Sequence, residues 1–236
     1  MALFFQQDID ETTRLALWKI EEDEAFFTQH VPLQRTITHP HKRLQHLAGR
    51  YLLKYLFPDF PIALIQIADT RKPYLKDEAY HFSISHCGDY AGVIVSRNRK
   101  VGMDIELFTP KIEKIAHKFV ADTEWAIVNG SVKGENSNVK EEVDEQAISN
   151  SKLQIPNSSP RTALEYLTLL WSCKEALFKW YGLGEVGFIR HMELKQIETI
   201  GEQQYELGFL FKKEKDLLLG LRSCFFKELV LSYMAT

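Results

Sequence analysis

The longest regular pattern of apolar positions lies between residues 160 and 182, where leucines recur at helical spacing. One side of this segment therefore belongs to a core. The leucines are Leu164, Leu167, Leu170 and Leu177. Signals for the helix start are Ser159, Pro160 and the pair Thr162 and Glu165, and signals for its end are Gly182 and Gly184. Since capping residues, an early proline and late glycines agree, we predict a helix over 160–182.

A neighbouring strip of this helix carries a carboxylate among aromatic side chains. Glu175 lies between Trp171 and Phe178, and Lys179 follows one turn later. A surface ion pair at this spacing stabilises a helix by about 0.2–0.5 kcal/mol and needs no function. The alternative is a functional pair, which only the rest of the chain can favour.

A second helix is predicted over residues 42–54, with a basic stripe along one side. The stripe consists of Arg43, His46, Arg50 and Lys54. Such a stripe is either a solvated face or a cradle for a polyanionic ligand, because guanidinium groups fit phosphate oxygens.

The remaining periodicities predict a mixture of strands and helices. Helical spacing is typical of residues 10–22 and 112–128. Strand patterns occur at 2–6, 62–67, 81–86, 91–96, 101–106, 192–198, 203–211, 217–223 and 227–233. Residues 129–159 contain no aromatic residue and are rich in polar residues, which predicts a mobile loop.

Two acids alternate with apolar residues in the strand 101–106. Asp104 and Glu106 are two positions apart, so they point to the same face, about 7 Å apart. Adjacent carboxylates on a buried strand repel each other and lose hydration, whereas a divalent cation would cancel that cost. Oxygen ligands alone favour Mg²⁺. The alternative is an edge strand whose acidic face is exposed to solvent.

Cations and polar groups occur close to other predicted strands. Arg71 and Lys72 precede a proline that fixes the backbone, and Ser85 and His86 end a strand. Glu124 adds an acid beside an aromatic residue. Together with the acids, these residues suit metal-assisted displacement at a diphosphate. A glycine-rich phosphate loop is missing from the sequence, which argues against an ordinary nucleotide kinase.

Composition narrows the class of protein. The 236 residues are 45% hydrophobic with a net charge of −3, which suits a core and gives no sign of nucleic-acid binding. We expect no membrane span and no secretory signal, because long apolar runs and a basic leader are missing. Cys87, Cys173 and Cys224 are odd in number and without metal-ligand spacing, so we expect packing residues in a reduced, cytoplasmic protein.

Five motifs in this order resemble the 4′-phosphopantetheinyl transferases, in particular the longer, surfactin-synthetase-activating type. The resemblance covers roughly residues 40 to 185. The motifs are Arg71-Lys72-Pro73, Phe82-Ser83-Ile84-Ser85-His86, Val101-Gly102-Met103-Asp104-Ile105-Glu106, the stretch from Phe119 to Glu124, and Trp171-Ser172-Cys173-Lys174-Glu175-Ala176-Leu177-Phe178-Lys179.

The resemblance implies an α+β fold of two similar α/β halves related by a pseudo-twofold, residues 1–107 and 108–236, with the active site between them. It implies a Mg²⁺-dependent enzyme, a monomer, of the holo-acyl-carrier-protein synthase type. The phosphopantetheine arm of coenzyme A would move to a serine of an apo acyl or peptidyl carrier protein, releasing adenosine 3′,5′-bisphosphate.

The resemblance also implies roles for individual residues. It assigns Mg²⁺ to Asp104, Glu106 and Glu175, and the diphosphate and leaving group to Lys179. Coenzyme A would contact Arg43, Arg50, Arg71, Lys72, Ser85 and His86, with His86 suited to the 3′-phosphate. The base stays open between Glu124, Glu175 and a metal-bound water.

Two other classes of function stay open. One is a non-catalytic module that binds coenzyme A or a carrier protein, although the intact Asp104, Glu106, Glu175 and Lys179 argue against lost catalysis. The other is a Mg²⁺-dependent phosphohydrolase that acts on coenzyme A and leaves free phosphopantetheine.

Overall fold

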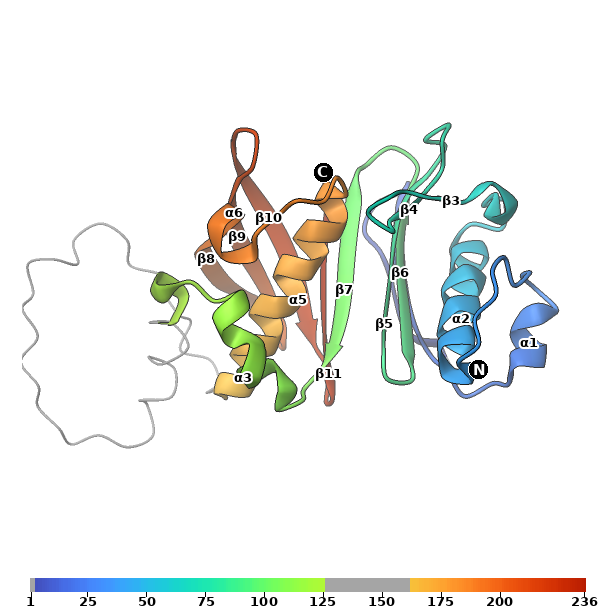
Figure 1. The fold of residues 1–236 in the computed structure, drawn as a ribbon, viewed down its shortest axis with the longest axis horizontal. Helices are drawn as coiled ribbons and strands as arrows, with labels where there is room; N and C mark the ends of the chain where they lie inside the picture. Colours follow the sequence, from blue (N-terminus) through green and yellow to red (C-terminus); the bar gives the residue numbers. More distant parts are fainter. Residues whose placement is uncertain (1–2, 126–161) are drawn as a thin grey trace, which may run out of the picture. The chain divides into compact units, whose positions relative to one another are not determined.

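The computed structural model describes residues 3–125 and 162–236 (Figure 1). It is a mixed α/β structure with several sheets and divides into two compact units. Unit 1 comprises Met1–Leu107, Glu175–Glu185 and Leu231–Thr236, and unit 2 comprises Phe108–Lys174 and Val186–Val230. The loop predicted at 129–159 and the helix-start signals Ser159 and Pro160 lie outside the described residues.

Unit 1 contains a four-stranded antiparallel sheet in the order β1-β2-β6-β5. Its strands are β1 (Leu3–Asp8), β2 (Thr13–Lys19), β5 (His81–Cys87) and β6 (Tyr90–Ser96). The predicted hairpin at 81–96 is confirmed, but the helix predicted over 10–22 is wrong, because this segment forms β2. Leu15 through Trp18 are all buried, so the strand is covered on both faces and shows no alternation that would have separated it from a helix.

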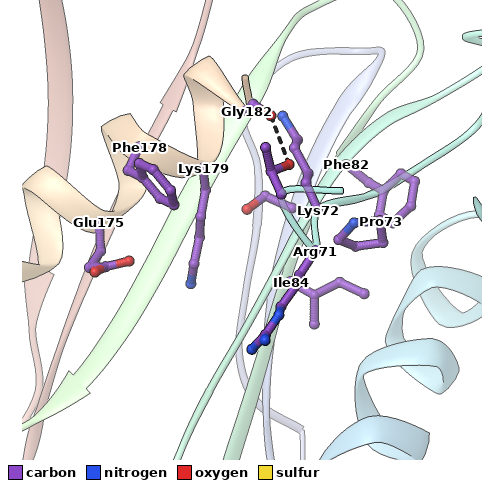
Figure 2. Close-up of a pocket in the computed structure, with 11 residues that line it drawn as sticks. Arg71, Lys72, Pro73, Phe82, Ile84, Glu175, Phe178, Lys179 and Gly182 are labelled. Atoms are coloured by element: carbon purple, nitrogen blue, oxygen red, sulfur yellow. Dashed lines mark hydrogen bonds between the residues drawn. The ribbon is translucent and has the colours of Figure 1, made fainter. Parts of the chain in front are cut away.

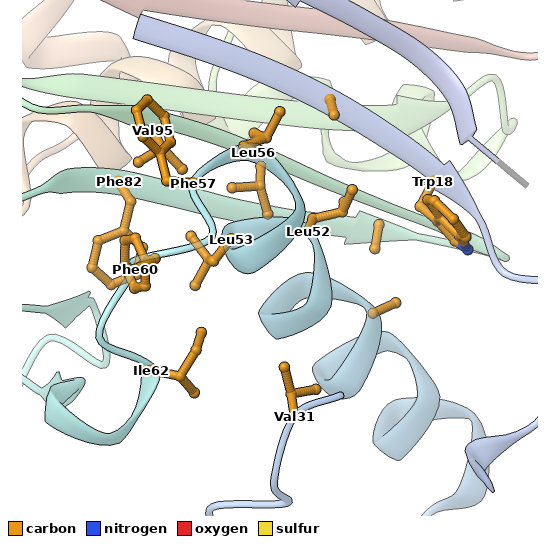
Figure 3. Packing of buried hydrophobic residues seen from close by; sticks show 14 of the residues in the cluster. Trp18, Val31, Leu52, Leu53, Leu56, Phe57, Phe60, Ile62, Phe82 and Val95 are labelled. Carbon is orange, nitrogen blue, oxygen red and sulfur yellow. The ribbon is translucent and has the colours of Figure 1, made fainter. Parts of the chain in front are cut away.

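Helix α2 (Pro40–Leu56) packs on β2, β5 and β6 and confirms the helix predicted over 42–54. Its leucines Leu52, Leu53 and Leu56 enter the core together with Trp18 of β2 (Figure 3). Pro40 occupies the first helical position, where its missing N–H costs nothing. The short helix α1 (Glu24–Thr28) precedes α2 and packs beside it.

The strand predicted over 62–67 is mostly wrong. The segment forms a 3-10 turn, η1 (Ile62–Leu64), followed by the two-residue strand β3 (Gln66–Ile67) paired with β4 (Pro73–Tyr74). Backbone N–H groups of Leu64 and Ile65 bond to carbonyls three residues earlier, so the first half turns instead of extending. Only Ile62 of this segment is buried, and the apparent alternation did not reflect a sheet face.

Strand β7 (Val101–Leu107) confirms the strand predicted over 101–106, and β11 (Leu229–Ala235) pairs with it. Gly102 of β7 touches the unit 1 part of helix α5 (Ala163–Tyr181). A Cβ atom at Gly102 would lie 2.2 Å from the carbonyl oxygen of Ala176 and 2.7 Å from the backbone nitrogen of Trp180. Glycine therefore lets the helix backbone rest directly on the strand.

Unit 2 contains an antiparallel meander and short helices. Its strands β8 (Met192–Gly201), β9 (Gln204–Lys212) and β10 (Asp216–Phe225) confirm the predicted C-terminal strands, as does β11. Helix α6 (Phe188–His191) precedes β8. The capping box that begins α5 is also confirmed, because Thr162 and Glu165 exchange hydrogen bonds between their side chains and backbone N–H groups.

The single helix predicted over 112–128 is wrong within the described residues. The segment breaks into α3 (Lys111–Ile115), η2 (Ala116–Lys118) and a helical stretch at 122–125. Phe119 has φ −135°, outside the helical range, and it is fully buried. Burial of this ring therefore outweighs helix continuation. None of the helices in 3–125 and 162–236 is both long and apolar enough to cross a bilayer.

We predict that Gly102→Ala lowers the free energy of unfolding by about 1–3 kcal/mol, because the added methyl must displace the backbone of α5. Urea unfolding measures the loss. Gly220→Ala is the matched control, since its Cβ would meet nothing nearer than a Glu206 carboxylate oxygen at 3.8 Å. Equal unfolding midpoints for the two variants would show that the contact of α5 with β7 tolerates a side chain.

Candidate active site

Asp104, Ser85 and Lys179 form one hydrogen-bonded cluster within unit 1. Lys179 Nζ donates to Asp104 Oδ1 at 2.6 Å and to Ser85 Oγ at 2.9 Å. Ser85 Oγ donates to the same oxygen of Asp104 at 2.7 Å. Asp104 is only 3% exposed, so its charge is balanced by an ammonium group in a largely dry environment.

Two more carboxylates lie within electrostatic reach of this cluster. Glu106 shares the face of β7 with Asp104 and accepts a weak hydrogen bond from the Cys87 thiol at 3.5 Å. Glu175 lies one turn before Lys179 on α5. Burial and the charges of Asp104 and Glu106, opposed by Lys179, together raise the pKa of Glu175 to about 7.

The three predicted metal ligands belong to unit 1 but are not gathered around one point. Among the residues that the structure describes, no three acidic, histidine or cysteine side chains are close enough together to form a ready metal site. Lys179 instead supplies the cation nearest Asp104.

A cavity of about 190 Å³ in unit 1 adjoins these side chains (Figure 2). Glu175 and Lys179 project from neighbouring turns of α5, and Arg71 and Lys72 come from the loop before β4. Burial and the charge of Lys100 lower the pKa of Lys72 to about 8. The cavity therefore combines cations with a carboxylate, which suits a small anionic ligand.

A second group of cations surrounds α2. Arg50 and His46 are buried on this helix, and Arg35 and His86 are close enough to lower the pKa of His46. Although His86 keeps an exposed surface, partial desolvation of its ring and the charges of Lys179 and Lys42 lower its pKa. His86 is therefore within electrostatic reach of both groups of charges.

Arg43 is placed differently from the other predicted cations. Its guanidinium forms an ion pair with Glu24 of α1, so part of the hydrogen-bonding capacity of Arg43 is already occupied in the absence of a ligand. The Nε atoms of Arg43 and Arg50 are both buried without a hydrogen-bond partner among the described residues, so the two arginines differ in the ion pair that only Arg43 forms there.

A family profile for the 4′-phosphopantetheinyl transferase superfamily matches residues 100–222, just over half of the chain. The chain belongs to this superfamily. A Haemophilus influenzae protein named "Putative 4'-phosphopantetheinyl transferase" is 34% identical to it over an alignment of 119 residues that covers 46% of this chain and 47% of that protein. The match thus spans about half of that relative's length, and the family assignment made from the five motifs is confirmed.

Glu124, predicted as a possible base, is part of a buried ion pair in unit 2 of this superfamily member. Lys174 Nζ donates to Glu124 Oε2 at 2.7 Å and to the carbonyl oxygen of Phe119 at the same distance. The other carboxylate oxygen accepts from the backbone N–H of Leu194 at 3.1 Å, and both side chains are 0–1% exposed. Burial lowers the pKa of Lys174, and the charge of Glu124 opposes this shift.

Sequence reasoning missed two of these charged residues as participants, Lys174 and Arg35. Lys174 continues the spacing of Leu167 and Leu170, and a charge in an apolar stripe is a signal for a buried ion pair. His46 was visible only as one member of the basic stripe, and Arg35 lies in an irregular segment without any pattern.

The cysteines fit the expectation that they are not nucleophiles. Cys173 and Cys224 are buried, and Cys87 is half-buried. Burial and the neighbouring Glu106 together raise the pKa of Cys87 to about 11, so the reactive thiolate is disfavoured.

We predict that Glu175→Gln stabilises the protein in metal-free buffer, and increasingly so as pH rises. The pKa of Glu175 is about 7 in the folded protein and 4.5 when unperturbed. Between these values the folded state binds more protons than the unfolded state, so wild-type stability falls with pH. Thermal unfolding at pH 4.5 and pH 8 in EDTA should show the advantage of the variant growing by several degrees. A constant difference would contradict the raised pKa.

We predict that Glu124→Gln costs about 3–5 kcal/mol of folding free energy, because it leaves the Lys174 ammonium buried without its counter-ion. The double variant Glu124→Gln/Lys174→Met should recover part of this loss, and chemical denaturation measures both. If Glu124→Gln has the same free energy of unfolding as the wild type, the ion pair between Glu124 and Lys174 does not stabilise the fold.

Proposed function

We propose that this chain transfers the 4′-phosphopantetheine arm of coenzyme A to a serine of an apo acyl or peptidyl carrier protein, with Mg²⁺, and releases adenosine 3′,5′-bisphosphate. The observation that carries the proposal is the meeting of Glu175, Lys179 and Lys72 at one cavity, beside the Asp104 cluster. Family membership and the name of the matched relative support the same activity.

Asp104, Glu106 and Glu175 are the residues that would hold Mg²⁺. Their oxygen-only donor set suits this ion, and the mutual repulsion that raises the pKa of Glu175 is what a divalent cation would relieve. When bound, the ion would neutralise charge on the diphosphate. Binding requires Lys179 to leave Asp104, because its Nζ contacts the carboxylate in the described structure.

The cations of unit 1 would then bind the phosphate groups of coenzyme A. Lys179 would move from Asp104 to the diphosphate. Lys72, from the loop before β4, would contact the same group. Arg71 lines this cavity as well. Before a ligand binds, Ser85 holds Asp104 and Lys179 in place through its hydrogen bonds to both. Arg50 and His86 belong to the cation group near α2, which suits the 3′-phosphate.

In the transfer step, the serine oxygen of the carrier protein attacks the phosphorus that bears the pantetheine arm. The bond from this phosphorus to the bridging oxygen breaks, and adenosine 3′,5′-bisphosphate leaves with the electron pair. We propose Glu175 as the acceptor of the serine proton, because its carboxylate lines the same cavity as Lys179 and Lys72. Glu124 is a weaker candidate, since both of its oxygens are already hydrogen-bonded in the interior.

The proposal keeps three further predictions from the sequence. These are an internal similarity between residues 1–107 and 108–236, a monomeric state and a cytoplasmic location. The three follow from the resemblance to the longer type of transferase and from composition, and they await their own tests.

We predict that incubation of apo carrier proteins with this protein, coenzyme A and Mg²⁺ adds one phosphopantetheine to the carrier, as measured by intact-protein mass spectrometry. EDTA should abolish the gain. Asp104→Asn and Lys179→Met should each slow it by at least about 100-fold, because charge on the transferring group is left unbalanced. Asp59→Asn is a matched control, since Asp59 pairs with Arg97 on the surface.

The same experiment separates the two alternatives. Free phosphopantetheine without carrier modification would identify a phosphohydrolase. Binding of coenzyme A without any product, on carriers of fatty-acid, polyketide and nonribosomal peptide synthesis alike, would identify a binding module and overturn the proposed transfer.

A further inference from the structure

A second cavity in unit 1 adjoins the cavity of the candidate active site. Its volume is about 440 Å³, more than twice that of the first cavity. The two cavities share the lining residues Lys72, Pro73, Phe82 and Gly182. We call the larger one the β4 cavity, because both residues of β4 line it. A cavity of this size suits a small organic ligand.

Aromatic rings form much of the wall of the β4 cavity. The rings belong to Tyr74, Tyr80, Phe82 and Tyr181. Tyr74 is 39% exposed, and Leu183 of the same lining is 67% exposed, although both side chains are large and apolar. A planar aromatic ligand would cover this surface and stack against the rings. The wall therefore favours an aromatic group over a purely polar one.

Two lysines bring positive charge to the β4 cavity. Lys100 Nζ lies 4.4 Å from the centroid of the Trp180 ring at the end of α5. Lys100 is also close enough to Lys72 for its charge to help burial lower the pKa of Lys72. Glu78 belongs to the lining too, but its charge is not among those that shift the pKa of Lys72. A carboxylate between the two lysines would relieve their repulsion.

The amine of Lys72 lies where the two cavities adjoin. Figure 2 shows it beside Gly182, away from the charged ends of Lys179 and Glu175. Lys72 Nζ donates a long hydrogen bond of 3.4 Å to the carbonyl oxygen of Trp180. A Cβ atom at Gly182 would lie 2.7 Å from this nitrogen, so glycine makes room for it. Within the described residues no carboxylate pairs with Lys72, which leaves its amine able to bind an anion in either cavity.

We propose that the β4 cavity is a second binding site, for a small aromatic carboxylate whose charged group lies between Lys72 and Lys100 and whose ring stacks on Tyr74. The cavity and its lining carry this assignment by themselves.

The effect of this ligand on activity rests on the proposed function, in which Lys72 contacts the diphosphate of coenzyme A. An aromatic carboxylate would hold Lys72 beside the end of α5 and so withdraw it from coenzyme A. Each ligand then weakens the binding of the other by the same factor, because coupling between two sites is reciprocal. The β4 cavity is thus an inhibitory site.

The test is isothermal titration calorimetry of the full chain with 2-naphthoate, and with 2-naphthylmethanol as an uncharged ligand of matched shape. We expect 2-naphthoate to bind at least about 10-fold more tightly than the alcohol, as charge-assisted hydrogen bonds should allow. Tyr74→Val and Lys100→Gln should each weaken its binding by about 10-fold. Both side chains are exposed, so these variants should fold, and Lys76→Gln, at an exposed lysine outside the lining, is the control.

A further variant shows which cavity the 2-naphthoate occupies. Arg71 lines the cavity of the candidate active site and not the β4 cavity, so Arg71→Gln should leave the affinity for 2-naphthoate unchanged. Titration of coenzyme A in saturating 2-naphthoate then measures the coupling. Its apparent Kd should rise by about 10-fold for the wild type and much less for Tyr74→Val.

The outcomes separate this inference from the proposed function. The site is refuted if 2-naphthoate binds no better than the alcohol, if Tyr74→Val and Lys100→Gln bind it like the wild type, or if Arg71→Gln weakens it equally. Tight binding of 2-naphthoate with an unchanged Kd for coenzyme A refutes the inhibitory role alone. Absence of coenzyme A binding or transfer refutes the proposed function, and the 2-naphthoate titrations still decide whether the β4 cavity is a binding site.

Discussion

The contact between α5 and β7 at Gly102 is the constraint on which the candidate site depends. No side chain separates the helix backbone from the strand at this point, since a Cβ atom would meet the Ala176 carbonyl oxygen. This close approach brings Lys179 of the helix within hydrogen-bond distance of Asp104 of the strand. A helix held one methyl group farther away would separate the two charges and weaken their attraction.

The protein treats its buried charges in three ways. Lys174 and Glu124 neutralise each other completely and behave as core. Lys179 and Asp104 are paired but open to solvent on the side of Lys179, which is 25% exposed, so they can exchange partners. Arg50 and His46 keep buried nitrogens without partners among the described residues. Buried polar groups that have their hydrogen-bond partners thus belong to the scaffold, whereas buried polar groups without such partners belong to regions suited to ligands.

Much of the fold follows from the sequence because its strongest local signals agree with one another. Three of these signals depend only on residues close together in the sequence: the capping box at Thr162, the hairpin at 81–96 and the alternation of β7. The errors arise where tertiary burial decides. Strand β2 resembles a helix because both of its faces are covered, and the segment after Lys118 breaks because Phe119 enters the core.

The candidate site, unlike much of the fold, was only partly predictable from the sequence. The acids and Lys179 were found because spacing along β7 and α5 places them on shared faces. The ion pair of Arg43 with Glu24, and the approach of Arg35 to α2, depend on contacts between segments distant in sequence or without regular structure. Periodicity carries no information about such contacts.

The lowered pKa of Lys72 has a consequence for its chemical reactivity. With a pKa of about 8, the Lys72 amine is uncharged in roughly half of the molecules at pH 8, against about 0.3% for an ordinary lysine with a pKa of 10.5. The uncharged amine is the nucleophile towards acylating and arylating reagents, and Lys72 lines the cavity of about 190 Å³. Lys72 is thus the lysine that a covalent inhibitor of this protein should be designed to reach.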